Sequence, residues 1–344
     1  MIQIQVKPQC GYFGECGGCA YQNLSYKQEL AIKDRLLQEI FAPLKLKSKM
    51  IESIIPSPDE YHYRNRLDFS FRKTLKGEYL LGFKSEQSKF IVPIESCSIA
   101  KEEISDFIPE LKDAVIRTLP PDYNIANLVV RTGDDGRVFW GGIGRHSLAQ
   151  KPGDYFWTEI HGYKIFYALD TFFQANLSIL PELINKIRSF RLWNSKTILY
   201  DLYSGVGLFG ISFHDRVKQV VMIEEGVPSI KLAKFNVDYH HLENVEIREG
   251  KVEQLLGRVR KDSVAIIDPP RKGLSDDAMK TLVKAKKLKA LLYLSCNPST
   301  LVRDLVHFVK RGWKINTVIP FDFFPKTKHI ETLVCLKPQR RSKS

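Results

Sequence analysis

The feature that most constrains the fold is a regular alternation of apolar runs and amphipathic segments in the carboxyl-terminal half of the chain. The apolar runs are short and rich in Val, Ile and Leu, as the buried strands of parallel sheets are. Segments with helical spacing separate them, and this alternation predicts an α/β fold with helices on both faces of the sheet. The predicted strands are residues 197–202, 219–223, 245–247, 264–267, 290–294, 313–320 and 330–336.

A glycine loop follows the first of these strands. Asp201 lies near the end of the strand, and Gly205 and Gly207 allow the backbone to approach a ligand closely. Glu224 ends the next strand, where nucleoside-binding α/β folds place an acid that contacts a ribose. The loop is not G-x-G-x-x-G, so S-adenosylmethionine is favoured over a dinucleotide. The alternative is a tight structural turn.

Cys296 lies at the carboxyl end of another predicted strand, which is the edge of an open α/β sheet where ligands bind. A helix over 301–310 follows, and its amino terminus is expected to favour the thiolate form of the cysteine. The pattern predicts a nucleophile, or else a small side chain that fills the strand end.

Two further strand ends carry acidic residues. Asp268 precedes two prolines, which cannot continue a central strand, so the chain must leave the sheet at this point. His329 and Glu331 are two residues apart and would share one face of a strand. A carboxylate there, near a catalytic thiol, is a candidate general base, although such a pair is often only solvated.

Three cysteines, Cys10, Cys16 and Cys19, lie in a glycine-rich amino-terminal loop with the spacing C-x5-C-x2-C. Cys97 is the candidate for a fourth ligand. Four thiolates suit either a structural zinc ion or an iron–sulfur cluster, and the residues alone leave both open. The spacing differs from the C-x3-C-x2-C of radical S-adenosylmethionine enzymes.

The remaining patterns divide the chain into four parts: a cysteine loop and helix (1–49), a small sheet-rich domain (50–170), the βα domain (171–336) and a basic tail (337–344). A helix is predicted over 24–41, with Ser25 as its N-cap and Gln28 three residues later. Residues 61–72 mix cations with aromatic rings, which suits RNA binding or a half-buried strand.

The net charge of +13 and the pI near 9.3 favour a polyanionic partner, with nucleic acid ahead of a membrane surface. No apolar run has the roughly 20 residues that a membrane span needs, and the first residues lack the apolar core of a signal peptide. A cytoplasmic protein is therefore expected, in which cysteine clusters bind metals rather than form disulfides.

Several motifs occur together in a fixed order: the cysteine quartet, Phe172-Phe173-Gln174, DLYSGVG, IDPPRKGL, SCNPSTLVRDL and HIET. With them the chain resembles the S-adenosylmethionine-dependent RNA uracil-5-methyltransferases, which make 5-methyluridine in ribosomal or transfer RNA. The resemblance covers almost the whole chain. It implies a Rossmann-like class I methyltransferase domain, a central domain and a [4Fe-4S] cluster.

The resemblance also implies roles for single residues. Cys296 matches the nucleophile of the family and Glu331 its base. The S-adenosylmethionine contacts correspond to Gln174, Tyr203, Glu224 and Asp268, and the cluster ligands to Cys10, Cys16, Cys19 and Cys97. Two positions depart from the family: Ser204 replaces a frequent cysteine, and Leu208 replaces an asparagine that contacts the cofactor in some members.

The chain begins close to its cysteine loop, without the amino-terminal RNA-binding barrel of many members. Ribosomal RNA, most plausibly 23S, is accordingly expected ahead of transfer RNA, and a monomer is expected. A methyltransferase acting on an exocyclic nitrogen is disfavoured, because it needs no cysteine and has an aromatic residue where this chain has Arg271. A non-catalytic iron–sulfur RNA-binding protein is the alternative from another class.

Overall fold

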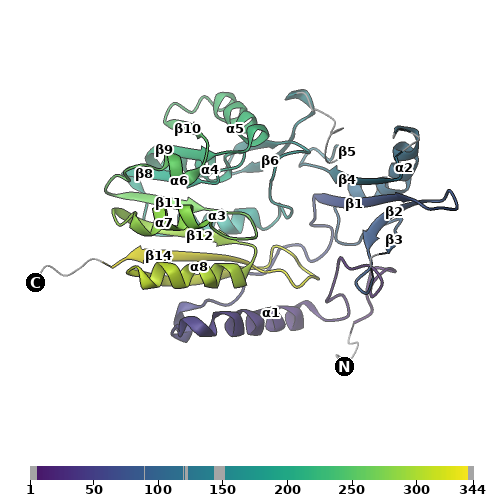
Figure 1. Cartoon of the computed structure of the whole chain (residues 1–344), viewed down its shortest axis with the longest axis horizontal. Coiled ribbons are helices and arrows are strands. Elements are labelled where there is room, and N and C mark those ends of the chain that lie inside the picture. Colours follow the sequence, from purple (N-terminus) through teal and green to yellow (C-terminus); the bar gives the residue numbers. More distant parts are fainter. Residues whose placement is uncertain (1–5, 89, 119, 121–122, 143–151, 340–344) are drawn as a thin grey trace, which may run out of the picture.

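The computed structural model describes residues 6–88, 90–118, 120, 123–142 and 152–339. Two larger sheets, of seven and five strands, stand side by side in an α/β protein (Figure 1). The seven-stranded sheet belongs to the carboxyl-terminal half, and its strands form the order β10-β9-β8-β11-β12-β14-β13. Their bounds are β8 Asn194–Leu202, β9 Val217–Glu224, β10 Val245–Glu249, β11 Ser263–Ile267, β12 Leu288–Ser295, β13 Trp313–Phe321 and β14 Glu331–Pro338.

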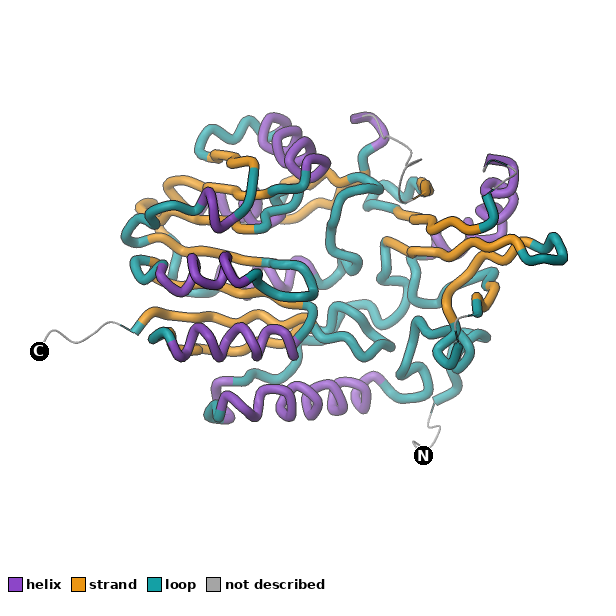
Figure 2. Tube along the Cα trace, viewed as in Figure 1, coloured by secondary structure: helices purple, strands orange, loops and turns teal. Residues whose placement is uncertain are grey.

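Neighbouring strands from β10 to β12 are parallel, and β14 runs antiparallel to both β12 and β13. The predicted parallel sheet is therefore confirmed, with an antiparallel strand inserted near one edge. Because β8, β9, β11 and β12 are parallel, the loops after them meet at one edge of the sheet. Figure 2 shows these loops facing the five-stranded sheet.

Helices cover both faces of the seven-stranded sheet, as the βα alternation predicts. One face packs against α3 (Leu180–Arg188), α4 (Leu208–Phe213) and α5 (Val227–Tyr239). The other packs against α1 (Tyr26–Phe41), α6 (Val252–Leu255), α7 (Asp276–Lys284) and α8 (Pro298–Lys310). Among the described helices, none is long and apolar enough to cross a membrane.

The amino-terminal helix α1 joins the seven-stranded sheet through buried charges. It begins with the predicted capping box, in which the backbone N–H of Gln28 donates to Ser25 and that of Ser25 donates to the Gln28 side chain. Lys33 is fully buried, and its Nζ lies 2.7 Å from a carboxylate oxygen of Glu29 and 2.7 Å from one of Asp322, which precedes β14. α1 is thus fixed to the loop between β13 and β14.

The five-stranded sheet is antiparallel, in the order β3-β2-β1-β4-β5, and α2 (Glu102–Thr118) packs on one face through its buried apolar side. Its strands are β1 Arg66–Lys73, β2 Tyr79–Lys84, β3 Ile91–Pro93, β4 Ile125–Arg131 and β5 Phe139–Gly142. A separate hairpin of β6 (Phe156–Ile160) and β7 (Tyr163–Tyr167) packs into the core of the seven-stranded sheet. The first strand of this hairpin is not predicted from the sequence.

Short 3-10 helices occupy four connections: η1 Ala42–Leu44, η2 Ser48–Met50, η3 Pro152–Asp154 and η4 His214–Arg216. The segment over 50–58 runs alongside β13. Ile51 bridges to Val318 and Ile55 to Phe321, so the segment closes the outer side of the last strand in the sheet.

Candidate active site

The glycine loop after β8 is held in a strained conformation by two carboxylates. The Gly210 N–H donates to the Asp201 carboxylate at 2.7 Å, and the Gly205 N–H donates to Glu224 at 2.9 Å. Gly205 has φ of +56° with open space where a Cβ would be, and Tyr203 has φ of +59° without being a glycine. Such conformations persist where the surroundings enforce them, and they are common at ligand sites.

Glu224 ends β9 and accepts hydrogen bonds on both carboxylate oxygens. One oxygen takes the Gly205 N–H, and the other takes the N–H groups of Glu225 and Gly226. A carboxylate has about four lone-pair sites, so acceptor capacity remains for a ligand hydroxyl. The structure thus joins the glycine loop to the acid that ends the next strand.

Gln174 and Asp268 come together from distant parts of the chain, with Gln174 Nε2 donating to Asp268 at 3.3 Å. The turn that carries Gln174 is fixed by Arg131 at the end of β4. This buried guanidinium donates to the carbonyls of Ala168, Thr171 and Phe173 at 2.8 to 3.1 Å. Gln174, Tyr203 and Asp268 line one narrow space above the sheet.

Cys296 and Glu331 lie at the junction of β12 and β14. The antiparallel register pairs Ser295 with Thr332, which brings the next residues, Cys296 and Glu331, next to each other. Glu331 is buried, and its Oε1 has no hydrogen-bond partner among the described residues. His329 lies in the loop before β14, not on the strand as predicted. It lines a cavity that also contains Cys296 and Glu331.

The expectation that a helix amino terminus favours the Cys296 thiolate is wrong for this structure. Asn297, not Cys296, caps α8, and its side chain accepts the N–H groups of Ser299 and Thr300. Burial raises the pKa of Cys296 to about 12, and the neighbouring carboxylates of Glu331 and Asp268 add to the rise. Arg271 opposes it only in part.

Buried carboxylates concentrate at the same edge of the sheet. Burial raises the pKa of Asp201 to about 8. Burial likewise raises the pKa values of Asp268 and of Glu331, and the charge of Asp268 raises that of Glu331 further. Burial therefore disfavours the charged forms of these carboxylates, and a cationic ligand would favour them.

A cavity of about 650 Å³ opens above Cys296, between the two sheets. The five-stranded sheet and the segment before β1 supply Arg64, Arg66 and Asp68, and the turn around Gln174 supplies another wall. The residues from the seven-stranded sheet and its loops are Arg271, Cys296, Phe324, His329 and Glu331. A flat heterocycle attached to a charged backbone could contact the arginine cations, the aromatic rings and the Cys296 thiol of this cavity at the same time.

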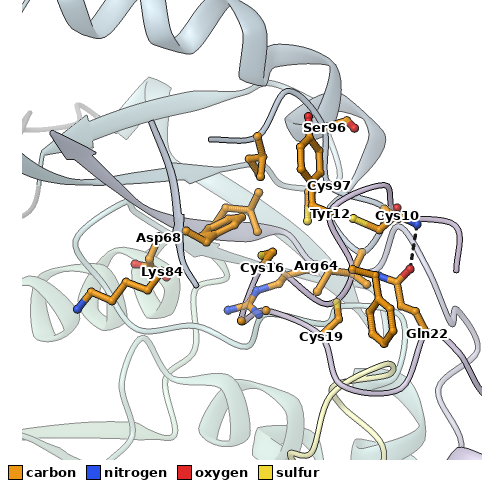
Figure 3. A pocket seen from close by; sticks show the side chains of 18 of the residues that line it. Cys10, Tyr12, Cys16, Cys19, Gln22, Arg64, Asp68, Lys84, Ser96 and Cys97 are labelled. Carbon is orange, nitrogen blue, oxygen red and sulfur yellow. Dashed lines mark hydrogen bonds between the residues drawn. The ribbon is translucent and has the colours of Figure 1, made fainter. Parts of the chain in front are cut away.

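The four predicted metal ligands converge on a second cavity, of about 410 Å³. Figure 3 shows the sulfurs of Cys10, Cys16, Cys19 and Cys97 facing a common space, with Arg64 beside it. The Cys10 N–H donates to the Gln22 side chain at 3.0 Å, which holds the start of the loop. The sequence signal and the geometry agree on this grouping.

The thiols of this second cavity are costly to ionise on their own. Burial raises the pKa of Cys19 to about 12, with smaller contributions from Cys97 and Cys10, and burial also raises the pKa values of Cys16 and Cys97. Within the described residues, no three His, Cys, Asp or Glu side chains lie close enough together to hold a single metal ion.

The sequence of the chain matches a known protein family and several of its members. Residues 157–339, more than half of the chain, match the family described as tRNA (Uracil-5-)-methyltransferase. A relative from Thermotoga maritima, named as an uncharacterized RNA methyltransferase, is 30% identical over 96% of this chain and 85% of its own length. The chain belongs to the tRNA (uracil-5-)-methyltransferase family. It is an S-adenosylmethionine-dependent RNA methyltransferase that acts on carbon 5 of uracil.

Two other proteins show how far the likeness of this methyltransferase extends. An RNA methyltransferase of Aquifex aeolicus is 29% identical over 96% of this chain and 84% of its own length. The crystal structure of a Pyrococcus abyssi tRNA (uracil-54, C5)-methyltransferase, in complex with S-adenosyl-L-homocysteine, matches with a TM-score of 0.73. It is 23% identical and covers 93% of this chain and 85% of that chain, so it shows the same fold.

Sequence reasoning missed two residues that shape the site of the methyltransferase. The sequence analysis gives Arg131 no role, although a lone arginine after the apolar Leu128-Val129-Val130 indicates that a buried cation contacts specific groups. Arg64 belongs to the segment 61–72, which was expected to bind RNA or to form a half-buried strand. In the structure it lines both the cysteine cavity and the cavity above Cys296, which no spacing in the sequence reveals.

Proposed function

We propose that the methyltransferase modifies uridine through a covalent bond between the Cys296 sulfur and carbon 6 of the base. The observation that carries this proposal is the junction of β12 and β14, where Cys296 and Glu331 are neighbours lining one cavity. Glu331 is buried with a free oxygen, which suits a group that must accept a proton from the substrate.

In the proposed reaction, the Cys296 thiol gives its proton to solvent water, and the thiolate sulfur adds to carbon 6, so that the electrons of the 5,6 double bond move toward the carbonyl at carbon 4. The resulting enolate makes carbon 5 nucleophilic. S-adenosylmethionine, when bound, supplies the methyl group to carbon 5. Glu331 then takes the proton from carbon 5, the double bond re-forms, and the carbon–sulfur bond breaks to release Cys296.

We infer that Gln174, Tyr203, Glu224 and Asp268 contact S-adenosylmethionine. The acceptor capacity left on Glu224 suits ribose hydroxyls, and the strained loop at Gly205 leaves open space beside it. The buried carboxylates at this edge favour a cationic sulfonium ligand. Residues 171–336 would supply this chemistry, and residues 50–170 would help to bind the RNA.

We propose a [4Fe-4S] cluster, rather than zinc, for Cys10, Cys16, Cys19 and Cys97. A tetrahedral zinc ion needs four sulfurs at about 2.3 Å from one centre, whereas four iron atoms and four sulfides occupy a larger volume. A cubane spans a larger space and suits the cavity of about 410 Å³. Absorbance and Mössbauer spectra of anaerobically purified protein would separate a cluster from zinc.

For the RNA we propose a uridine of 23S ribosomal RNA, because the strong positive charge suits a large polyanion. The T-loop uridine of transfer RNA is the second candidate. It is favoured by the name of the similar Pyrococcus abyssi structure, a tRNA (uracil-54, C5)-methyltransferase. Labelled methyl transfer to each unmodified RNA, with nucleosides identified by mass spectrometry, decides between them.

The mechanism is tested with two variants and two matched controls. Cys296→Ala should abolish methyl transfer, whereas Cys335→Ala, which removes a buried thiol from β14 away from the cavity, should retain it. Glu331→Gln should accumulate a protein–RNA adduct that survives denaturing electrophoresis, and the exposed Glu225→Gln should not. Methylation by Cys296→Ala would refute the nucleophile, and an absent adduct would assign the base to another residue.

A further inference from the structure

A group of mostly exposed cations lies at the end of the seven-stranded sheet that is opposite to Cys296, where the strand ends, not an outermost strand, form the surface. The amino ends of β12 and β13 and the carboxyl end of β14 meet there, at the left of the sheet in Figure 1. We call this surface the basic edge; its members are Lys284, Lys286, Lys287, Lys289, Lys310, Arg311, Lys314 and Lys337. The segments that supply them, 284–289, 310–314 and 337–339, contain no acidic residue.

The cations come from three segments that are in direct contact. Lys314 pairs with Lys337 across the β13–β14 ladder. Lys286 Nζ donates to the carbonyls of Arg311 and Gly312 at 2.6 and 2.8 Å, and the Gln339 N–H donates to Gly312 at 2.9 Å. The basic edge is therefore one continuous surface of the fold.

A fourth segment extends this surface along the outer side of β13. Lys45, Lys47 and Lys49 are exposed, while the intervening Leu44 and Leu46 pack toward the core that contains Trp313. Ile51, just beyond them, bridges to Val318 of β13. The alternation thus directs three more cations to solvent beside the basic edge.

Some cations elsewhere in the same half of the chain are neutralised by acidic partners. Lys186 pairs with Glu52 at 2.6 Å, and Arg248 pairs with Glu246 at 2.7 Å. Among the described residues, no member of the basic edge is in an ion pair. Like charges held together repel one another and lower stability, so such a surface is best explained by a polyanion that neutralises it.

We propose that the basic edge binds the phosphate backbone of the RNA substrate at a region remote from the target uridine. β12 separates this surface from Cys296, and its eight residues span about 25 Å. One RNA that occupies both places must therefore extend around the end of the domain. Lysines act as point charges without base-edge geometry, so this contact would be independent of sequence.

The proposal rests on the family membership of the chain and not on the Cys296 mechanism. The test compares Lys284→Gln/Lys310→Gln with the control Lys27→Gln/Lys231→Gln. The control removes the same charge from exposed positions on α1 and α5, outside the domain proposed to bind the RNA. Lys286 and Lys289 are left intact because they donate to backbone carbonyls. Binding is measured between 0.1 and 0.5 M salt to an unmodified 23S ribosomal RNA transcript and to hexauridylate, which is too short to reach both surfaces.

Each lost phosphate contact lowers the slope of log affinity against log salt by about 0.7 to 0.9, or about five- to eightfold in affinity at 0.1 M salt. On the transcript, the Lys284→Gln/Lys310→Gln variant should lose affinity, and its salt slope should become shallower, by the amounts expected for up to two phosphate contacts. Its binding to hexauridylate should be unchanged. The control should retain both.

Equal effects of the variant and the control, or equal losses on both RNAs, would overturn the proposal. Unchanged transcript binding together with lost binding to phosphatidylglycerol vesicles would also overturn it and assign the surface to a membrane. Adduct formation by Glu331→Gln is measured independently of RNA binding at the basic edge. A negative result in the binding test therefore leaves the proposed mechanism standing, and a negative result in the adduct test leaves the proposed RNA contact standing.

Discussion

We predict that the buried ion pairs of Lys33 stabilise the packing of the amino-terminal helix α1 against the catalytic half of the chain. Lys33→Met removes a fully buried cation whose Nζ lies 2.7 Å from both Glu29 and Asp322 and 3.1 Å from the Phe324 carbonyl. Methionine fills much of the same volume, so the loss is electrostatic rather than steric. The two carboxylates would remain buried with their shared cation gone.

Breaking a buried pair by removing one partner costs about 3 to 5 kcal/mol. The unfolding entropy is about 2.1 cal/mol/K per residue, or roughly 0.7 kcal/mol/K for 344 residues. The Tm of a transition that unfolds the whole chain should therefore fall by about 4 to 7 °C. The loss should grow with pH, because unpaired buried carboxylates have raised pKa values and destabilise the fold once they ionise.

Differential scanning calorimetry at pH 5, 7 and 9 measures both effects. The control is Lys280→Met, whose ion pair with Asp277 is about 70% exposed and therefore screened by solvent. The neutral combination Glu29→Gln/Lys33→Met/Asp322→Asn should recover most of the lost stability. A Tm drop in Lys33→Met no larger than in the control, or the absence of recovery, would refute this electrostatic explanation.

Three further predictions concern the active site. Because the pKa of Cys296 is about 12, its alkylation by iodoacetamide, followed by mass spectrometry, should accelerate about tenfold per unit between pH 7 and 10; a plateau near pH 8 would contradict this. Asp201 has a pKa of about 8, above its unfolded value, so the stability it contributes is complete below about pH 4 and falls by up to about 1.4 kcal/mol per unit toward pH 8. Asp201→Asn should flatten that decline in thermal melts at pH 5, 7 and 9, and parallel curves would argue against it. Arg131→Lys should lose some of the three carbonyl contacts and weaken S-adenosylmethionine binding about tenfold in calorimetry; unchanged affinity would mean that the turn around Gln174 is held without Arg131.

Periodic and local signals in the sequence predicted the fold well. The capping box of Ser25 and Gln28 and the parallel order of the strands depend on neighbouring residues and on hydrophobic spacing, and both are present. The hairpin strand Phe156–Ile160 was missed because its burial comes from helices and loops that are far away in the sequence. Tertiary packing decided that element.

The chemistry of the site was less predictable than its location. The residues at the strand ends were found because parallel strands bring their carboxyl ends together. The direction of the Cys296 pKa was predicted wrongly, since it depends on burial and on Glu331, 35 positions later in the chain. Likewise, the support that Arg131 gives to the turn around Gln174 depends on a fold that brings residues 37 to 42 positions apart into contact.

The contact between α1 and the loop before β14 also sets an order for synthesis. Lys33 bonds to Asp322 across 289 positions of sequence, so α1 cannot dock until nearly all of the chain has left the ribosome. At about 5 to 20 residues per second, that interval lasts roughly 15 to 60 seconds. During this interval the loop with Cys10, Cys16 and Cys19 has no contact with Lys326. In the folded protein, the backbone N–H groups of Ala20 and Tyr21 donate to the Lys326 carbonyl. The thiols are therefore accessible to delivery of iron and sulfide, and to oxidants, before the last strands close the structure.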